Sequence, residues 1–245
     1  MQIYAFHGFL GQPKDWESFA QTHPQRQWHL IDLFDERIFR PTEGFWPSAR
    51  RFNASVETSA AKKVLLGYSL GGRFALHALL DQPCLWDAAV IVSANPGLAK
   101  EEERKKRCEH DDRWADRFLS EESWNDIMHD WDSQGVFSRS ASIERPEGDF
   151  SGEALAHVLT GWSLGRQENL KPEIERLNIP ILWIAGEYDQ KFSTIARSLT
   201  LSHPFSRVWI APDADHRVPW KQRKSFQQQM EIFFNNVSNT TLARM

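Results

Sequence analysis

Short apolar runs separated by helix-like segments recur along the chain. The runs are rich in Val, Ile, Leu and Ala and have the length and composition of strands that are buried on both faces. Six segments follow this pattern and are predicted as strands: 2–6, 28–34, 63–68, 87–93, 179–185 and 207–211. Because helical patterns alternate with these runs, the sequence predicts a mostly parallel sheet covered by helices on both faces.

Helical spacing of apolar positions predicts the covering elements. The segments expected to be helical are 15–20, 54–61, 74–80, 193–201 and 220–235. Between the second and third strands, residues 36–53 mix polar and aromatic positions with Pro41, Gly44 and Pro47. This composition predicts a long loop, and long ordered loops often contribute to function.

The middle third of the chain interrupts the strand pattern. Residues 98–119 are strongly helical and heavily charged, which is typical of a solvated helix face. An apolar stripe at helical spacing follows in residues 124–131, then a loop at 138–151 and a helix at 153–163. We therefore expect 98–163 to be a helical cap inserted into one core domain formed by 1–97 and 164–245.

The third apolar run ends in Gly67-Tyr68-Ser69-Leu70-Gly71, with a helical pattern directly after it. Strand, tight turn and helix around Gly-x-Ser-x-Gly are the context of a nucleophile elbow. The two glycines leave room for a strained turn that exposes the serine hydroxyl. The alternative is a glycine-rich connection that binds a phosphate or nothing.

The first strand runs into His7-Gly8-Phe9-Leu10-Gly11. A short strand followed by His-Gly and small residues is similar to the loop that completes an oxyanion hole. The expected donors are the backbone N–H groups of Phe9 and Leu70. We expect His7 to fix the loop rather than to take part in the chemistry.

Asp189 and His216 each follow a predicted strand, and the carboxyl ends of parallel strands meet at one edge of a sheet. The chain order Ser69, Asp189, His216 is that of the α/β-hydrolase fold. His216 would activate the serine hydroxyl, and Asp189 would hold its imidazole and stabilise the imidazolium. Asp213 and Asp215 remain alternative acids.

Composition limits the classes of protein to which the chain could belong. The chain has 245 residues, 41% hydrophobic and 25% charged, and a net charge of −4, which argues against nucleic acid as a partner. Its two cysteines, Cys84 and Cys108, form neither a disulfide framework nor a metal-ligand spacing. The first residues have neither the basic region nor the apolar core of an export signal, and no apolar run reaches membrane length, so we expect neither export nor a membrane span. We expect a cytoplasmic enzyme with no metal, no cofactor and no membrane partner, of undetermined oligomeric state.

Further motifs narrow the family. They are Gly67-Tyr68-Ser69-Leu70-Gly71-Gly72-Arg73, Asn95-Pro96-Gly97-Leu98, Arg113-Trp114-x-x-Arg117-Phe118-Leu119, Asp130-Trp131-x-x-Gln134-x-Val136-Phe137 and Gly186-Glu187-x-Asp189-x-Lys191-Phe192. Together with a basic helix that ends at Arg107, these motifs resemble the 2-succinyl-6-hydroxy-2,4-cyclohexadiene-1-carboxylate synthase (MenH) family. The resemblance extends from about residue 5 to residue 216.

That resemblance implies a lyase of menaquinone biosynthesis. Its substrate would be 2-succinyl-5-enolpyruvyl-6-hydroxy-3-cyclohexene-1-carboxylate, a small polycarboxylate. A proton beside the succinyl carbonyl is removed and pyruvate is eliminated, with the serine acting as a base and forming no acyl-enzyme. The resemblance also places Tyr68 and Trp131 in the substrate pocket.

Three carboxylates on the substrate require cations, and the planar guanidinium of arginine suits a carboxylate. The resemblance assigns this role to Arg73 and Arg107. A third arginine of the family falls in the cap segment before 153–163, where Arg145 is preferred and Arg139 is the alternative.

Two features depart from the family pattern. Met1 sits almost on the first strand, so the N-terminal hairpin of the family is expected to be missing. Residues 32–37 replace a Gly-His-Gly turn that commonly lines the site. A serine hydrolase acting on an anionic substrate, whether an esterase, a thioesterase or a C–C bond hydrolase, is therefore the alternative. A non-catalytic binding protein of the same fold is a third reading. The arginine set favours the synthase.

Overall fold

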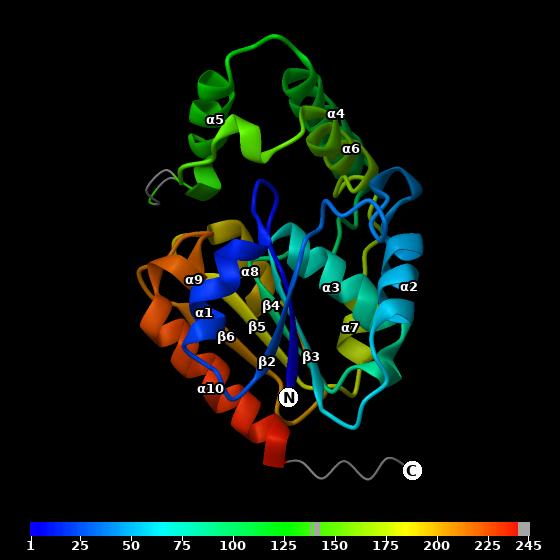
Figure 1. Cartoon of the computed structure of the whole chain (residues 1–245), viewed down its shortest axis with the longest axis vertical. Coiled ribbons are helices and arrows are strands. Elements are labelled where there is room, and N and C mark those ends of the chain that lie inside the picture. The colour runs from blue at the N-terminus through cyan, green and yellow to red at the C-terminus, as the bar shows by residue number, and fades with distance from the viewer. Residues whose placement is uncertain (138, 140–142, 240–245) are drawn as a thin grey trace.

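A six-stranded parallel sheet forms the centre of the protein (Figure 1). The computed structural model describes residues 1–137, 139 and 143–239. The strand order is β2-β1-β3-β4-β5-β6, and every neighbouring pair is parallel. The strands are β1 (Gln2–Phe6), β2 (Gln27–Ile31), β3 (Lys63–Tyr68), β4 (Ala88–Val92), β5 (Ile181–Gly186) and β6 (Arg207–Ala211). The predicted parallel α/β architecture is confirmed.

Each central strand sends alternate side chains to two apolar layers, as the period of two requires. In β1, Tyr4 and Phe6 enter one layer, whereas Ile3 and Ala5 enter the other. The first layer is covered by α2 (Phe45–Ser55), α3 (Leu70–Asp81), α7 (Lys171–Arg176) and α8 (Gln190–Arg197). The second is covered by α1 (Glu17–Gln21), α9 (Val218–Lys221) and α10 (Arg223–Asn239).

The segment expected as a cap lies beyond the carboxyl ends of the strands (Figure 1, green). It contains α4 (Glu101–Leu119), α5 (Trp124–Asp132) and α6 (Gly152–Gly161). A separate apolar cluster joins these helices through Trp114, Phe118, Ile127 and Leu155. Leu10 packs into it from residues 7–11, here called the oxyanion loop after their expected role. The cap therefore rests directly on the edge of the sheet where the site residues were expected.

Short 3-10 helices complete the described chain. They are η1 (Pro13–Trp16), η2 (Pro41–Glu43), η3 (Pro83–Leu85), η4 (Gly135–Phe137) and η5 (Glu147–Asp149). None of the helices in the described ranges combines the length and the apolar character that a membrane span requires.

Two local predictions are wrong. Residues 36–53, expected as a loop, contain most of α2, and 54–61, expected as a helix, begin where α2 ends. Pro47 is tolerated because it lies in the first turn, where a missing N–H costs no helical hydrogen bond. The buried positions Phe45, Ala49 and Phe52 then hold the helix against the sheet.

Two other element boundaries differ between the prediction and the structure. The second strand ends at Ile31 rather than at residue 34, because the Leu33 N–H donates to the ring of His7 instead of to a strand. The last helical segment begins at Val218 and is divided into α9 and α10.

Candidate active site

Ser69 lies in the turn between β3 and α3 with a φ of 52° and a ψ of −111°, a strained conformation for a residue with a side chain. Close packing of the turn explains its glycines. A Cβ on Gly67 would lie 2.3 Å from the Gly71 carbonyl oxygen, and one on Gly71 would lie 2.4 Å from that of His7. The Ser69 N–H donates to the Val92 carbonyl at 2.8 Å, which fixes the turn to the neighbouring strand.

His216 and Asp189 complete a hydrogen-bonded chain with the serine. The distance from His216 Nδ1 to Asp189 Oδ2 is 2.6 Å, and the distance from His216 Nε2 to Ser69 Oγ is 2.9 Å. Because the carboxylate accepts a hydrogen bond from Nδ1–H, Nε2 is left without a proton and can accept the serine proton. Both Asp189 and His216 are buried. This arrangement can remove a proton through Ser69 or activate it as a nucleophile.

The alternative acids have other partners. Asp213 accepts a hydrogen bond from the Tyr188 hydroxyl at 2.7 Å, and Asp215 accepts one from the Arg217 N–H at 3.1 Å. The geometry therefore favours Asp189 as the acid beside His216.

The loop after β1 approaches the elbow from the side. Phe9, Ser69 and Leu70 line the same pocket, and no acceptor within the described residues occupies the N–H of Phe9 or of Leu70. His7 is fully buried; its Nε2 accepts from the Leu33 N–H at 3.0 Å, and its Nδ1 contacts the Gly8 carbonyl at 2.8 Å. The structural role predicted for His7 is confirmed.

The pocket beside Ser69 that contains Arg73, here called the Arg73 pocket, is walled by the core and the cap. Its lining comprises Phe9, Ser69, Leu70, Arg73, Ser93, Asn95, Arg107, Asp111, Trp131, Val158, Leu159, Trp162, Leu164 and Phe192. It brings the triad serine together with two of the three arginines expected to bind carboxylates.

Arg73 is a buried cation held by neutral groups. Its Nε donates to Gln167 Oε1 and one Nη donates to the Trp162 carbonyl, both at 2.7 Å. Its guanidinium also lies 4.9 Å from the centre of the Phe45 ring. Burial, together with the positive charge of Arg107, lowers the pKa of Arg73 to about 9. Arg73 is therefore charged at neutral pH, and no carboxylate of the described residues pairs with it directly.

Arg107 is oriented by an acid on its own helix. Its Nε lies 2.8 and 2.9 Å from the two carboxylate oxygens of Asp111, which also accepts from the Ser163 hydroxyl at 2.7 Å. Burial alone would raise the pKa of Asp111, but hydrogen bonds and charge from His110, Arg107 and Ser163 outweigh it and lower that pKa. Asp111 is thus an ionised positioning group for Arg107.

A second pocket, here called the Arg145 pocket, lies on the Tyr68 side of the oxyanion loop. Arg145 lines it with Tyr68, and Phe9 and Trp131 belong to both pockets. Trp131 packs on Phe9 with ring centres 4.8 Å apart. Burial raises the pKa of Tyr68, so its phenol remains neutral. Arg139, the alternative third arginine, instead lies with its guanidinium 3.9 Å from the centre of the Tyr188 ring.

Sequence reasoning gave no role to several charged residues that line these pockets. Lys191 shares a further pocket with Ser69, Arg107 and His216, and burial, with the charge of Arg107, lowers the pKa of the lysine. Its place in the Gly186-Glu187-x-Asp189-x-Lys191-Phe192 motif was the available signal. Arg217 lines the Arg145 pocket, and its position directly after the expected base could have indicated this.

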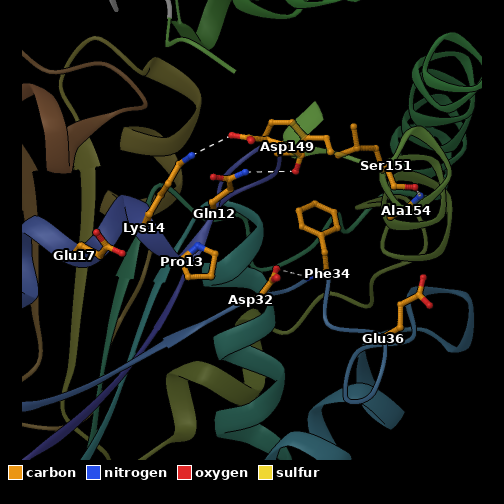
Figure 2. Close-up of a pocket in the computed structure, with 12 residues that line it drawn as sticks. Gln12, Pro13, Lys14, Glu17, Asp32, Phe34, Glu36, Asp149, Ser151 and Ala154 are labelled. Carbon is orange, nitrogen blue, oxygen red and sulfur yellow. Dashed lines mark hydrogen bonds and ion pairs between the residues drawn. The ribbon is translucent and has the colours of Figure 1, made fainter. Parts of the chain in front are cut away.

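A larger cavity of about 520 Å³ lies away from the triad (Figure 2). Asp32, Phe34 and Glu36 line it, so the segment that departs from the family pattern faces this cavity. Lys14 forms an ion pair with Asp149 at 3.0 Å across its rim, which links η1 of the core to η5 of the cap. The cavity shares Gln12, Lys14, Asp149 and Phe150 with the Arg145 pocket.

Metal chemistry has no evident site in the described ranges. Across residues 1–137, 139 and 143–239, no group of three or more His, Cys, Asp and Glu side chains is placed to hold a metal ion.

Comparison with known sequences agrees with this geometry. A profile of the alpha/beta hydrolase fold matches residues 3–222. The 2-succinyl-6-hydroxy-2,4-cyclohexadiene-1-carboxylate synthase of Serratia proteamaculans is 30% identical over 239 residues, which cover 94% of this chain and 91% of the relative. The synthase of the same name from Yersinia pestis is 32% identical over 212 residues, covering 82% and 78%.

Solved structures show the same fold. The structure of MenH from S. aureus superposes with a TM-score of 0.84 at 22% identity, covering 97% of this chain and 95% of that one. A thermophilic esterase from Thermogutta terrifontis superposes with a TM-score of 0.69 at 16% identity, covering 97% and 90%. At these identities the likeness concerns the fold alone.

Proposed function

The chain belongs to the 2-succinyl-6-hydroxy-2,4-cyclohexadiene-1-carboxylate synthase family within the α/β-hydrolases, and on this premise we propose that it is a lyase of menaquinone biosynthesis. Its substrate is 2-succinyl-5-enolpyruvyl-6-hydroxy-3-cyclohexene-1-carboxylate. The products are pyruvate and 2-succinyl-6-hydroxy-2,4-cyclohexadiene-1-carboxylate. The two relatives compared above carry the name of this synthase, and the side chains around Ser69 suit the reaction.

The reaction begins with loss of the ring proton beside the succinyl carbonyl. Ser69 Oγ takes this proton while its own proton passes to His216 Nε2, and Asp189 stabilises the imidazolium that forms. The electron pair left on carbon becomes an enolate. The backbone N–H groups of Phe9 and Leu70 donate to its oxygen, where negative charge develops.

Elimination follows without a covalent bond to the enzyme. The enolate carbonyl re-forms, the electron pair moves through the ring double bond, and the bond from the ring to the enolpyruvyl oxygen breaks. The leaving group takes the proton from His216 and becomes pyruvate. His216 returns to its neutral form, and the ring keeps two conjugated double bonds.

The observation that carries the proposal is that two arginines share a pocket with the triad serine. Arg73 and Arg107 line the pocket of Ser69, and Arg73 is buried with no direct carboxylate partner in the part of the chain that the structure describes. A substrate carboxylate would supply that charge, and a guanidinium binds a carboxylate in a fixed orientation. We assign a further carboxylate to Arg145 and contacts with the ring to Tyr68 and Trp131. A pocket for a neutral ester has no use for these cations.

The triad geometry equally suits nucleophilic attack, so hydrolysis of an anionic substrate is the second candidate. The test supplies the enolpyruvyl substrate, made enzymatically in the same tube, and follows pyruvate and the absorbance of the conjugated ring. We expect Ser69→Ala to lower turnover by on the order of 100- to 10,000-fold, because the base is lost.

Ser55→Ala is the matched control, since Ser55 is exposed at the end of α2 and its hydroxyl donates to the Phe52 carbonyl. It should turn over the substrate like the wild type. No pyruvate release above the spontaneous rate, with serine-dependent cleavage of an activated ester, would replace the lyase with the hydrolase.

A further inference from the structure

Two arginines that line the Arg145 pocket, Arg145 and Arg217, form a bridge through Asp132. Arg217 Nη2 donates to Asp132 Oδ1 at 2.7 Å, and Arg145 Nη2 donates to the same oxygen. The side chains of Arg217 and Arg145 are only 6% and 7% exposed. The Arg217 guanidinium also packs on the Phe137 ring, 4.4 Å from its centre. Such packing fixes the orientation of the fork, as a binding residue requires.

The bridge joins elements that are far apart in the sequence. Asp132 ends α5 of the cap, Arg145 belongs to the segment before η5, and Arg217 follows His216 in the core. Consecutive Cα atoms are about 3.8 Å apart, so Arg217 begins one residue from the base of the triad. Tyr68, the residue before Ser69, lines the same pocket. Phe137, on which the Arg217 guanidinium packs, also lies with its ring centre 5.6 Å from that of His216, so one side chain separates the bridge from the base of the triad.

One donor of the bridge has no acceptor. The Nε of Arg145 is buried and makes no hydrogen bond with the part of the chain that the structure describes. An unpaired buried N–H is costly, and a charged one is more so. Asp15, an acid lining the same pocket, accepts a hydrogen bond from the Gln12 N–H at 2.9 Å and none from the Nε of Arg145. An anion in the pocket would supply the missing acceptor.

We propose that Arg217 is a further substrate-binding residue, which with Arg145 binds one carboxylate of the substrate in the Arg145 pocket. This inference rests on the proposed function. The cations then form two pairs, Arg73 with Arg107 in one pocket and Arg145 with Arg217 in the other. The pockets meet at the oxyanion loop, so the enzyme selects a substrate with carboxylates on both sides of the carbon that loses its proton. Asp132 positions the second pair.

Steady-state pyruvate release by Arg217→Gln and Arg217→Lys tests the proposal. Arg217→Gln should raise KM by about 10- to 100-fold, the effect of losing a charged hydrogen bond, with kcat changed by less than about threefold. Arg217→Lys keeps the charge for Asp132 and should raise KM less. Arg139→Gln is the matched control, because it removes the same charge from an exposed arginine that packs on the Tyr188 ring. Its KM should equal that of the wild type.

A second arginine substitution tests whether both residues hold the same carboxylate. The combined Arg145→Gln and Arg217→Gln variant should raise KM by clearly less than the product of the two single effects. A product of independent effects would overturn the shared subsite.

Binding of propane-1,2,3-tricarboxylate, measured as a shift in the thermal midpoint, separates this inference from the proposed function. Wild type and Arg139→Gln should be stabilised by the tricarboxylate, and Arg217→Gln should lose most of that shift. If the wild type releases no pyruvate but this loss is seen, the reaction is wrong and the subsite stands.

Different results are expected if Arg217 only stabilises the fold through its contact with Asp132. In that case Arg217→Gln would lower the thermal midpoint and kcat while KM and the tricarboxylate shift stay as in the wild type, and the proposal would be overturned. Should Arg217→Gln fail to fold, Arg217→Lys decides, since wild-type KM in that variant contradicts a bidentate role.

Discussion

Buried charge is the most informative property of single residues at this site. Arg73 is held by an amide oxygen, a backbone carbonyl and an aromatic ring, none of which carries negative charge. Arg107, in contrast, is paired with the buried carboxylate of Asp111. Arg73 gains more from an anionic substrate than Arg107 does, because no carboxylate among residues 1–137, 139 and 143–239 pairs with it directly.

The lowered pKa of Arg73 leads to a prediction for the pH profile. Burial brings this pKa to about 9, so the guanidinium is charged below that pH and loses its charge as pH rises through it. KM for the polyanionic substrate should therefore rise above about pH 9. In Arg73→Lys the rise should begin at lower pH, because the same burial would act on a lysine, whose ordinary pKa is already lower than that of arginine.

Measurement of KM across this pH range checks the prediction. Arg176→Lys, an exposed exchange on α7, is the control and should keep the wild-type profile. A KM that stays constant up to about pH 10 in both wild type and Arg73→Lys contradicts the assignment.

The turn between β3 and α3 is the element on which the site depends. The start of α3 packs so closely on the end of β1 that a Cβ on Gly71 would clash with the carbonyl oxygens of Phe6 and His7. The same contact brings the loop with Phe9 beside Ser69. Steric fit, rather than hydrogen bonding alone, thus places the expected oxyanion donors relative to the serine.

Gly71→Ala should disrupt this contact. Its Cβ would lie 2.4 Å from the His7 carbonyl oxygen, which belongs to backbone that cannot rotate away. We expect a loss of at least about 2 kcal/mol in the free energy of unfolding, and a fall in kcat, because the turn must shift.

Denaturant unfolding and pyruvate release measure these two effects. Gly148→Ala is the control, since nothing lies within 4 Å of a Cβ built there, and it should leave both quantities near wild type. Wild-type stability and turnover in Gly71→Ala would show that the close approach is not required.

At the scale of the whole molecule, the core and the cap meet around the site through both exposed and buried contacts. The Lys14–Asp149 ion pair connects η1 with η5 at the rim of the large cavity, and Gln12 donates to the Asp149 carbonyl (Figure 2). Deeper in, Trp131 of α5 packs on Phe9. The outer contact is exposed, whereas the inner one is part of the pocket wall.

Lys14→Ala should release the outer contact without affecting the core. We expect faster amide hydrogen exchange at residues 147–150 and an unchanged thermal midpoint, because an exposed ion pair adds little to stability. Lys100→Ala, which removes an exposed pair with Glu103 near the start of α4, is the control and should leave this exchange unaltered. Equal exchange in wild type and Lys14→Ala would mean that the pair does not hold η5 on the core.

Local patterns in the sequence were sufficient for the sheet, the serine and the histidine, and they left three candidate acids, of which Asp189 was preferred. The apolar runs at 63–68 and 179–185 predicted strands because alternate side chains must enter two buried layers. The elbow followed from glycines on both sides of Ser69, since neighbouring backbone atoms leave no room for a Cβ. Asp189 and His216 were found because polar residues at the carboxyl ends of parallel strands share one edge.

Propensity was misleading where tertiary packing decides. Pro41, Gly44 and Pro47 predicted a loop, yet α2 forms because Phe45, Ala49 and Phe52 find an apolar layer to enter. The helix expected over 54–61 was also placed too late, because α2 ends at Ser55. Packing against the rest of the molecule outweighs these weak local preferences.

Sequence alone determined the strands, the serine turn and the order of the triad, because these depend on sterics and burial between near neighbours. Tertiary structure decided which acid meets His216, which cap arginine lines a pocket, and that Arg217 meets Asp132 across 85 residues of sequence. Such contacts depend on how distant segments pack, and a pattern along the chain holds no information on the distance between side chains that only folding brings together.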